Sequence, residues 1–257
     1  MLSAETGDIL ALCVLAALGL SPSVWVILMM RRAPISPLQS ILFAINYILT
    51  RIIWRTEIRG RLPALPPGQG VVIVCNHRCP LDPSFIALTG PRVIYWLVAR
   101  EYCEYPPFRA LLRICGSIPV TRGGTDPGAM KTVVRLLEQG ALVGFFPEGH
   151  INTTARTLLP GRRGAALAAL KGRAAVVPCC IDGAPYDGTT LGCMVMPARV
   201  TLTIGEPIDI GPYFGRENDR AVLDEVTRLF LSAIARLAGD ETFQPELAGR
   251  KTKDTSP

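Results

Sequence analysis

The sequence has few histidines and lacks the cysteine spacing of zinc modules. His77 and His150 are the only histidines among 257 residues. The eight cysteines stand mostly in apolar runs, without the paired spacing that holds a zinc ion. We therefore expect buried thiols in a reducing compartment and no metal site.

The basic residues never gather into a dense run. The chain has 27 Lys and Arg against 21 Asp and Glu, a net charge of +6, and 23 of the basic residues are arginine. Because nucleic-acid-binding tails carry clustered positive charge, we expect no nucleic-acid partner. The planar guanidinium group binds phosphate well. The charge therefore indicates phosphorylated ligands or an anionic membrane surface.

The amino-terminal part contains a long uncharged stretch. Residues 9–30 carry no charge and would extend about 33 Å as a helix, which matches the core of a bilayer. The acidic Glu5 and Asp8 precede it, which argues against a secretory signal, and Arg31 and Arg32 follow it. The positive-inside rule then places the remaining chain on the cytoplasmic side of the cell membrane.

A second helix is expected directly after this stretch. From residue 38 to residue 52, apolar side chains recur at spacings of three and four, and Arg51, Arg55 and Arg59 follow near the end. Such a helix either packs on the domain or lies on anionic lipid. Pro22 and Pro34 weaken a straight span, so a hairpin inserted from one side is a further alternative. We assign residues 1–55 to membrane anchoring.

Strands and helices alternate from residue 56 onward. Strands are predicted at 56–60, 71–75, 93–98, 117–121, 142–146, 174–181 and 200–204, and helices at 83–88, 107–114, 127–139, 163–170 and 219–237. This order predicts an α/β domain over residues 56–239, with a mixed, largely parallel sheet flanked by helices. Pro178 marks its strand as an edge strand or a kinked one. Residues 240–257 are expected to form a flexible tail.

One histidine and one aspartate stand where chemistry is expected. His77 follows the apolar strand 71–75, and Asp82 directly precedes Pro83, which is a signal for the start of a helix. Two interpretations remain open. His77 is a loop histidine and Asp82 a helix cap, or the carboxylate fixes one ring nitrogen and leaves the other as a general base.

Two further charged residues follow predicted strands. Arg122 is placed to bind a phosphate near the next helix, which Asp126 is expected to cap. Glu148 is placed to order a substrate hydroxyl or to pair with Arg122. In open α/β sheets ligands bind along the carboxyl ends of the strands. Both residues are therefore expected to share one cleft with His77 and Asp82.

Four short motifs appear in a fixed order. They read Asn76-His77-x-x-x-x-Asp82, Gly116-x-x-Pro119-Val120-x-Arg122, Phe146-Pro147-Glu148-Gly149 and Val177-Pro178. This set resembles the motifs of the glycerophospholipid acyltransferases, and the length is similar to that of 1-acyl-sn-glycerol-3-phosphate acyltransferases. The resemblance implies that His77 is the base and Asp82 its partner. It also implies that Arg122, Glu148 and Gly149 bind the phosphate and glycerol of the acceptor.

The resemblance implies a reaction at the membrane. An acyl group would pass from acyl-CoA or acyl-carrier protein to the sn-2 hydroxyl of lysophosphatidic acid, with membrane lipids as partners and no cofactor or metal. The sequence departs from the family's motifs at two places. Cys79 stands where the first motif often has serine, and residues 150–152 stand where the third motif is often followed by Thr-Arg-Ser. The second removes an arginine. Glycerol 3-phosphate, another lysophospholipid or a lyso-aminolipid thus remain alternative acceptors, and a non-catalytic lipid-binding protein remains an alternative function.

Overall fold

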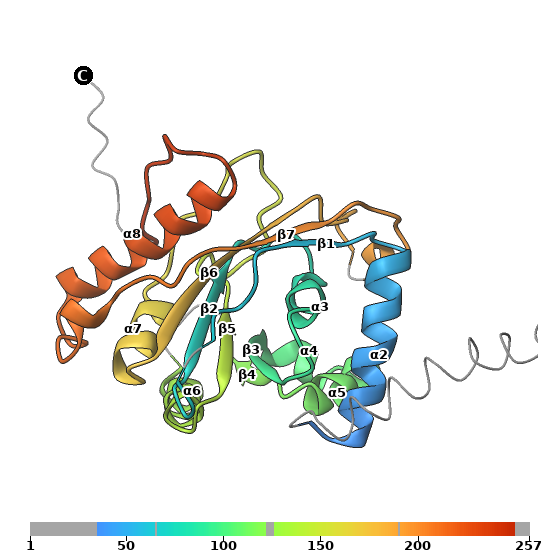
Figure 1. The fold of residues 1–257 in the computed structure, drawn as a ribbon, viewed down its shortest axis with the longest axis horizontal. Coiled ribbons are helices and arrows are strands. Elements are labelled where there is room, and N and C mark those ends of the chain that lie inside the picture. Colours follow the sequence, from blue (N-terminus) through green and yellow to red (C-terminus); the bar gives the residue numbers. More distant parts are fainter. Residues whose placement is uncertain (1–34, 65, 122–125, 190, 250–257) are drawn as a thin grey trace, which may run out of the picture.

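The computed structural model describes residues 35–64, 66–121, 126–189 and 191–249, and its centre is one seven-stranded sheet (Figure 1). The strand order is β1-β7-β6-β2-β5-β3-β4, and every pairing is parallel except β6 with β7. The predicted mixed, largely parallel sheet is therefore confirmed. The strands are β1 (Glu57–Arg59), β2 (Val71–Cys75), β3 (Ile94–Ala99), β4 (Ile118–Val120), β5 (Leu142–Phe145), β6 (Ala175–Asp182) and β7 (Thr201–Ile204).

Helices cover both faces of the sheet. In Figure 1, α6, α7 and α8 lie on one side of the strands, and α2 to α5 lie on the other. The helices are α2 (Pro37–Ile52), α3 (Asp82–Ala87), α4 (Arg100–Glu104), α5 (Pro106–Ile114), α6 (Pro127–Glu138), α7 (Gly164–Lys171) and α8 (Arg220–Leu237), with 3-10 turns at Gly192–Met194 and Gly211–Tyr213.

The central strand β2 contributes to two hydrophobic cores. Val72 and Val74 pack into the core under α6, α7 and α8, while Ile73 and Cys75 pack into the core that contains α3. Successive side chains of a strand point to opposite faces, so an all-apolar strand is stable only when both faces are covered. This explains why a run of buried residues without polar alternation forms the middle of the sheet.

The position of Pro178 differs from the expectation of an edge strand. β6 lies inside the sheet, between β2 and β7, and Pro178 is aligned with Val74. Pairing with β7 begins only at Cys179, opposite Ile204, and the carbonyl of Pro178 accepts from the backbone N–H of Gly205 at 2.8 Å. The missing N–H of the proline therefore falls where β7 ends. A proline is tolerated there because no ladder hydrogen bond is lost.

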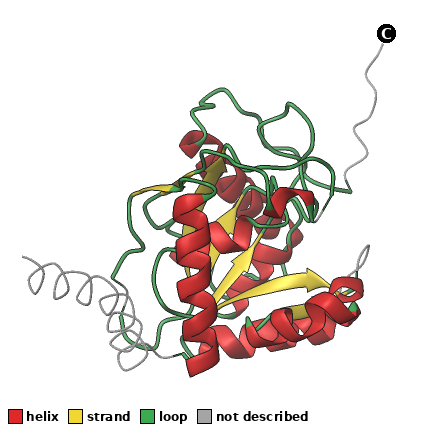
Figure 2. Ribbon diagram, turned by 90° about the vertical axis from the view of Figure 1, so that its right-hand side faces the viewer, coloured by secondary structure: helices red, strands yellow, loops and turns green. Residues whose placement is uncertain are grey.

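Helix α2 lies on the outside of the molecule (Figure 2). It confirms the predicted amphipathic helix, but its apolar side is exposed. Its polar side faces the domain: Asn46 Nδ2 donates to the carbonyl of Ser84 at 2.9 Å, and Gln39 Nε2 donates to that of Ile114 at 2.8 Å. The alternative in which the apolar side packs on the domain is therefore wrong for the described residues. We call the exposed residues the apolar stripe: Leu38, Ile41, Ile45, Ile48, Leu49 and Ile52.

The other predicted membrane segment, residues 9–30, lies outside the described residues. Across the part of the chain that the structure describes, no helix has both the length and the apolar character needed to cross a bilayer. At the other terminus, residues 240–249 were expected in the flexible tail, but they pack on the domain. Leu247 is buried, and the backbone N–H of Ala248 donates to the carbonyl of Gly161 at 2.9 Å.

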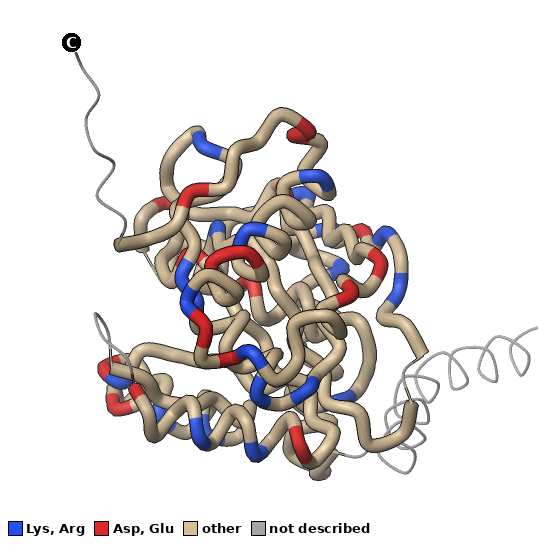
Figure 3. The backbone as a smooth tube through the Cα atoms, turned by 90° about the vertical axis from the view of Figure 1, so that its left-hand side faces the viewer, with Lys and Arg blue, Asp and Glu red and all other residues tan. Residues whose placement is uncertain are grey.

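Charges of both signs are interspersed along the side of the molecule that carries α8. Figure 3 shows Lys and Arg next to Asp and Glu over this view, without a large area of one sign. A nucleic-acid-binding surface presents clustered positive charge to the phosphate backbone. The expected absence of a nucleic-acid partner stays a prediction.

Candidate active site

The candidate site begins where β2 ends. The side chain of Asn76 is buried and forms two hydrogen bonds with the backbone of Ile181 in β6: Nδ2 donates to the carbonyl at 2.8 Å, and Oδ1 accepts from the N–H at 2.7 Å. The side-chain amide thus continues the β2–β6 pairing by one residue, in place of a strand backbone. It fixes the point at which His77 leaves the sheet.

His77 and Asp82 are in direct contact. His77 Nδ1 lies 2.8 Å from Asp82 Oδ2, and the same oxygen accepts from the backbone N–H groups of Arg78 at 2.6 Å and Cys79 at 2.9 Å. The Asp82 side chain is fully buried, while that of His77 is 17% exposed. Within the described residues Nε2 of His77 has no hydrogen-bond partner. A carboxylate on Nδ1 favours the tautomer that leaves Nε2 able to accept a proton.

The interpretation of Asp82 as a helix cap is wrong. Helix α3 begins at Asp82 itself, with Leu81 in the capping position, and no side chain caps this helix. The Asp82 carboxylate instead points back to the loop that precedes it. Pro83 still occupies a position in the first turn, where its missing N–H costs nothing. The helix start thus places the carboxylate beside the imidazole.

A stack of rings fixes the plane of the imidazole. The His77 ring lies parallel to Phe146, with centroids 4.0 Å apart and an interplanar angle of 8°. Phe146 in turn stacks on Trp96 at 4.6 Å and 17°. The buried ring of Trp96 supports Phe146 from β3. Rotation of His77 about its side-chain bonds would break both the stack and the contact with Asp82.

Glu148 fixes the backbone of His77 by hydrogen bonding. Its Oε1 accepts from the N–H of His77 at 2.8 Å, and its Oε2 accepts from the N–H of Leu159 at 2.7 Å. The side chain is only 2% exposed. Burial raises the pKa of Glu148, and the two backbone hydrogen bonds oppose that shift. The carboxylate therefore positions the loop, and a contact with substrate stays a prediction.

Gly149 follows in a backbone conformation that favours glycine. Its φ is +72°, and an added Cβ would lie 2.8 Å from Cδ of Arg162. The N–H of Gly149 closes a turn by donating to the carbonyl of Phe146 at 3.0 Å. This turn carries Phe146, which stacks on the His77 ring, and Glu148, which accepts from the His77 backbone N–H. The role of Gly149 in substrate binding stays a prediction.

The predicted phosphate ligand Arg122 lies outside the described residues. Asp126 confirms its expected role, because its Oδ1 accepts from the N–H of Ala129 at 3.0 Å and caps α6. At the start of α7, Arg163 pairs with Asp224, and Arg162 Nη2 lies 2.9 Å from Nε2 of His150. The structure thus brings His77, Asp82 and Glu148 together at one edge of the sheet, as predicted.

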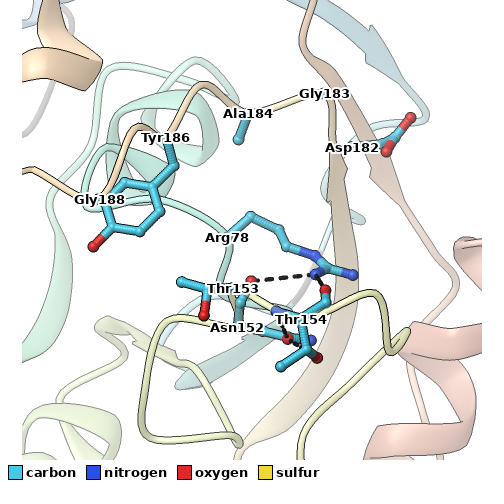
Figure 4. Close-up of a pocket in the computed structure, with 9 residues that line it drawn as sticks. All are labelled: Arg78, Asn152, Thr153, Thr154, Asp182, Gly183, Ala184, Tyr186 and Gly188. Carbon is cyan, nitrogen blue, oxygen red and sulfur yellow. Dashed lines mark hydrogen bonds between the residues drawn. The ribbon is translucent and has the colours of Figure 1, made fainter.

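A cavity of about 420 Å³ opens beside the loop that carries His77. Figure 4 shows the Arg78 side chain crossing it towards the loop at Asn152 and Thr154. The lining comprises Arg78, Asn152, Thr153, Thr154, Asp182, Gly183, Ala184, Tyr186 and Gly188. Arg78 and Asn152 were not among the predicted site residues, although Arg78 lies inside the first motif. Their contacts join loops that are far apart in the chain.

Known proteins match the part of the chain that builds this site. A family model described as Acyltransferase matches residues 56–182, from just before β1 to the end of β6. A 1-acyl-sn-glycerol-3-phosphate acyltransferase of Bacillus subtilis (strain 168) is 31% identical over 145 residues, which cover 56% of this chain and 69% of that protein. The chain belongs to the acyltransferase family. The resemblance seen in the four motifs is thereby confirmed.

A further relative of this acyltransferase and a solved structure extend the comparison. The uncharacterized protein ML2427 of Mycobacterium leprae (strain TN) is 25% identical over 239 residues, covering 77% of this chain and 62% of that protein. The crystal structure of the 1-acyl-sn-glycerophosphate acyltransferase PlsC from Thermotoga maritima superposes with a TM-score of 0.57 at 16% identity, covering 93% of this chain and 97% of that chain. The two proteins share a fold.

Proposed function

We propose that this acyltransferase transfers an acyl group from an acyl thioester, acyl-CoA or acyl-carrier protein, to the sn-2 hydroxyl of lysophosphatidic acid, giving phosphatidic acid. The observation that carries the proposal is the 2.8 Å contact between His77 and a fully buried Asp82. It lies in a chain 31% identical to a 1-acyl-sn-glycerol-3-phosphate acyltransferase.

In the proposed mechanism His77 is the general base. Nε2 takes the proton of the acceptor hydroxyl as its oxygen attacks the thioester carbonyl, and Asp82 stabilises the imidazolium that forms. The new C–O bond forms, the C–S bond breaks, and the proton passes from the imidazolium to the leaving thiolate. A positioned base contributes a factor of about 10² to 10⁴. The proposed chemistry uses no resident cofactor and no covalent acyl-enzyme.

A competition assay tests the proposed acceptor. The purified protein, reconstituted in vesicles, is given one acyl-CoA together with equal amounts of lysophosphatidic acid, glycerol 3-phosphate and neutral lysophospholipids. We expect mass spectrometry to find phosphatidic acid as the main product, with one free thiol per product. The replacement of Thr-Arg-Ser by residues 150–152 makes this comparison informative.

Each other result of the assay assigns a different function. A main product from another acceptor would keep the chemistry and change the substrate. Thiol release without an acceptor would indicate a hydrolase. Lipid binding without any thiol release would indicate a non-catalytic lipid-binding protein. A parallel assay with acyl-carrier protein as donor identifies the source of the acyl group.

We also propose that the apolar stripe of α2 lies on an anionic lipid surface, at the cytoplasmic face of the cell membrane. The stripe runs the length of the helix, and Arg51 stands in its last turn. Apolar residues on one helix face with basic residues beside them are typical of interfacial helices. This orientation would place the acyltransferase domain next to its lipid acceptor.

Changing the stripe is expected to weaken membrane binding without unfolding the protein. Ile45→Ser with Ile48→Ser removes two apolar side chains that are about half exposed. If each loses about 1 kcal/mol of transfer free energy, partitioning into anionic vesicles falls roughly 30-fold. Vesicle co-sedimentation measures this, with Ile45→Leu and Ile48→Leu as the apolar control. Equal binding by both double variants would contradict the proposal.

A further inference from the structure

Arg78 lies between His77 and Asp82 in the sequence, and its side chain is half-buried. The guanidinium group donates four hydrogen bonds, all to backbone carbonyls of one loop. Nη1 donates to Asn152 at 3.2 Å and Thr154 at 3.0 Å, and Nη2 donates to Arg156 at 2.9 Å and Thr157 at 3.2 Å. We call residues 152–157 the clamped loop. It contains no helix or strand.

The clamped loop returns to the backbone of His77. The N–H of Asn152 donates to the carbonyl of His77 at 2.7 Å. The Asn152 side chain orders the loop itself, since Nδ2 donates to the carbonyl of Arg156 and Oδ1 accepts from the N–H and hydroxyl of Thr154. Hydrogen bonds thus connect the Arg78 side chain, through Asn152, to the backbone of His77.

Arg78 also contacts the other member of the pair. Its backbone N–H donates to Asp82 Oδ2 at 2.6 Å, the oxygen that contacts His77. The backbone of Arg78 therefore orients the carboxylate, and its side chain secures the loop that holds the His77 carbonyl. Both contacts of Arg78 help to set the distance between Nδ1 of His77 and Oδ2 of Asp82.

We propose that Arg78 is a positioning residue, whose guanidinium group fixes the clamped loop and thereby holds His77 in register with Asp82. The inference rests on the proposed role of His77 as the base. The side chain of Arg78 contacts neither the imidazole nor the reacting atoms, because both terminal nitrogens donate to carbonyl oxygens of the clamped loop.

The shape of the guanidinium group, and not its charge alone, accounts for these contacts. Each of its two terminal nitrogens donates to a pair of carbonyls, whereas a lysine ammonium presents its donors from a single point. Lysine therefore keeps the charge but cannot bind both pairs. The cavity in Figure 4 reaches Arg78 from outside, so a free guanidinium ion can enter once the side chain is removed.

The test compares Arg78→Lys and Arg78→Ala with the wild type in the acyltransferase assay. Loss of positioning is expected to lower kcat about 10- to 100-fold, since small displacements of a catalytic group have effects of this size. KM for both substrates should change less than about threefold because no substrate contact is removed. Tens of millimolar guanidinium should raise kcat of Arg78→Ala several-fold and leave that of the wild type unchanged.

Arg216→Lys is the matched control. Arg216 is exposed and pairs with Asp219 at 3.1 Å, at the start of α8. The kcat of the Arg216→Lys variant should therefore equal that of the wild type. Wild-type kcat in Arg78→Lys would overturn the proposal. So would a loss in Arg78→Ala that only matches a smaller folded fraction by circular dichroism and does not respond to guanidinium.

A second readout separates this inference from the proposed function. The chain has two histidines, so the imidazole NMR signals are few and assignable with His150→Ala. The Nδ1 proton of His77, hydrogen-bonded to Asp82, should be resolved in the wild type and lost or shifted in Arg78→Lys. If the wild type had no acyltransferase activity but Arg78→Lys still lost or shifted this proton signal, the proposed reaction would be rejected and the positioning role would stand. An unchanged proton would reject the positioning role whatever the activity.

Discussion

His77→Ala is expected to lower acyl transfer by a factor of about 10² to 10⁴, the contribution of a positioned base. The variant removes the imidazole that contacts the fully buried carboxylate of Asp82. The fold should survive because the ring stands at the edge of the sheet and packs on Phe146, outside the two cores. Thiol release in the presence of lysophosphatidic acid measures the loss.

The second histidine is the natural control for this experiment. His150 lies near the same turn, where its Nε2 lies 2.9 Å from Nη2 of Arg162, and it is not part of the contact between His77 and Asp82. His150→Ala should therefore keep most of the turnover. Both variants should bind vesicles as the wild type does, since α2 is unchanged. Near-normal turnover of His77→Ala would reject the general-base mechanism.

Asp82→Asn is expected to be nearly as damaging, although it changes only one atom. The amide oxygen can occupy the place of Oδ2 and still accept from the N–H groups of Arg78 and Cys79. The amide nitrogen then takes the place of Oδ1, a buried atom without a hydrogen-bond partner among the described residues. The negative charge that stabilises the imidazolium is lost. We expect kcat to fall by a factor of about 10² to 10⁴.

Asp219→Asn is the control for Asp82→Asn. It makes the same substitution away from the site and so shows whether replacing an aspartate by asparagine lowers kcat in general. Asp219 accepts from the N–H of Ala221 at 2.9 Å and caps α8, a role that asparagine fills equally well. Thermal unfolding of both variants should resemble that of the wild type, and Asp219→Asn should keep its kcat. If Asp82→Asn also kept its kcat, stabilisation of the imidazolium by this carboxylate would be wrong.

Much of the fold could be predicted because local signals agreed with the tertiary structure. Residues 71–75 were predicted as a strand buried on both faces, and β2 has these bounds and contributes to two cores. The predicted helix 127–139 begins at Pro127 behind its Asp126 cap and ends at Glu138. Proline and aspartate at a helix start act within a few residues, so the sequence carries their effect directly.

Other features depend on neighbours that a sequence does not reveal. Pro178 indicated an edge strand, and only the end of β7 opposite it explains how an interior strand tolerates proline. The spacing in α2 predicted an amphipathic helix. It did not show which side faces the domain, because the polar side finds partners in α3 and α5.

The site divides in the same way. Spacing alone placed His77 and Asp82 near each other, since five residues and a helix start limit their separation. The buried role of Glu148 was not predictable, because its partners are backbone N–H groups, which any residue supplies. Arg78 was missed for the same reason: its four acceptors are carbonyls. Backbone partners leave no residue-type pattern.

The hydrogen bonds around Asn76 and His77 have a consequence for the folding of the chain during translation. Asn76 binds a residue 105 positions later in the chain, and His77 binds one 71 positions later. A nascent chain on the ribosome therefore carries its histidine long before the supports for it emerge. Recovery of turnover after dilution from denaturant should report the joining of β2, β5 and β6, because contacts so distant in sequence form late.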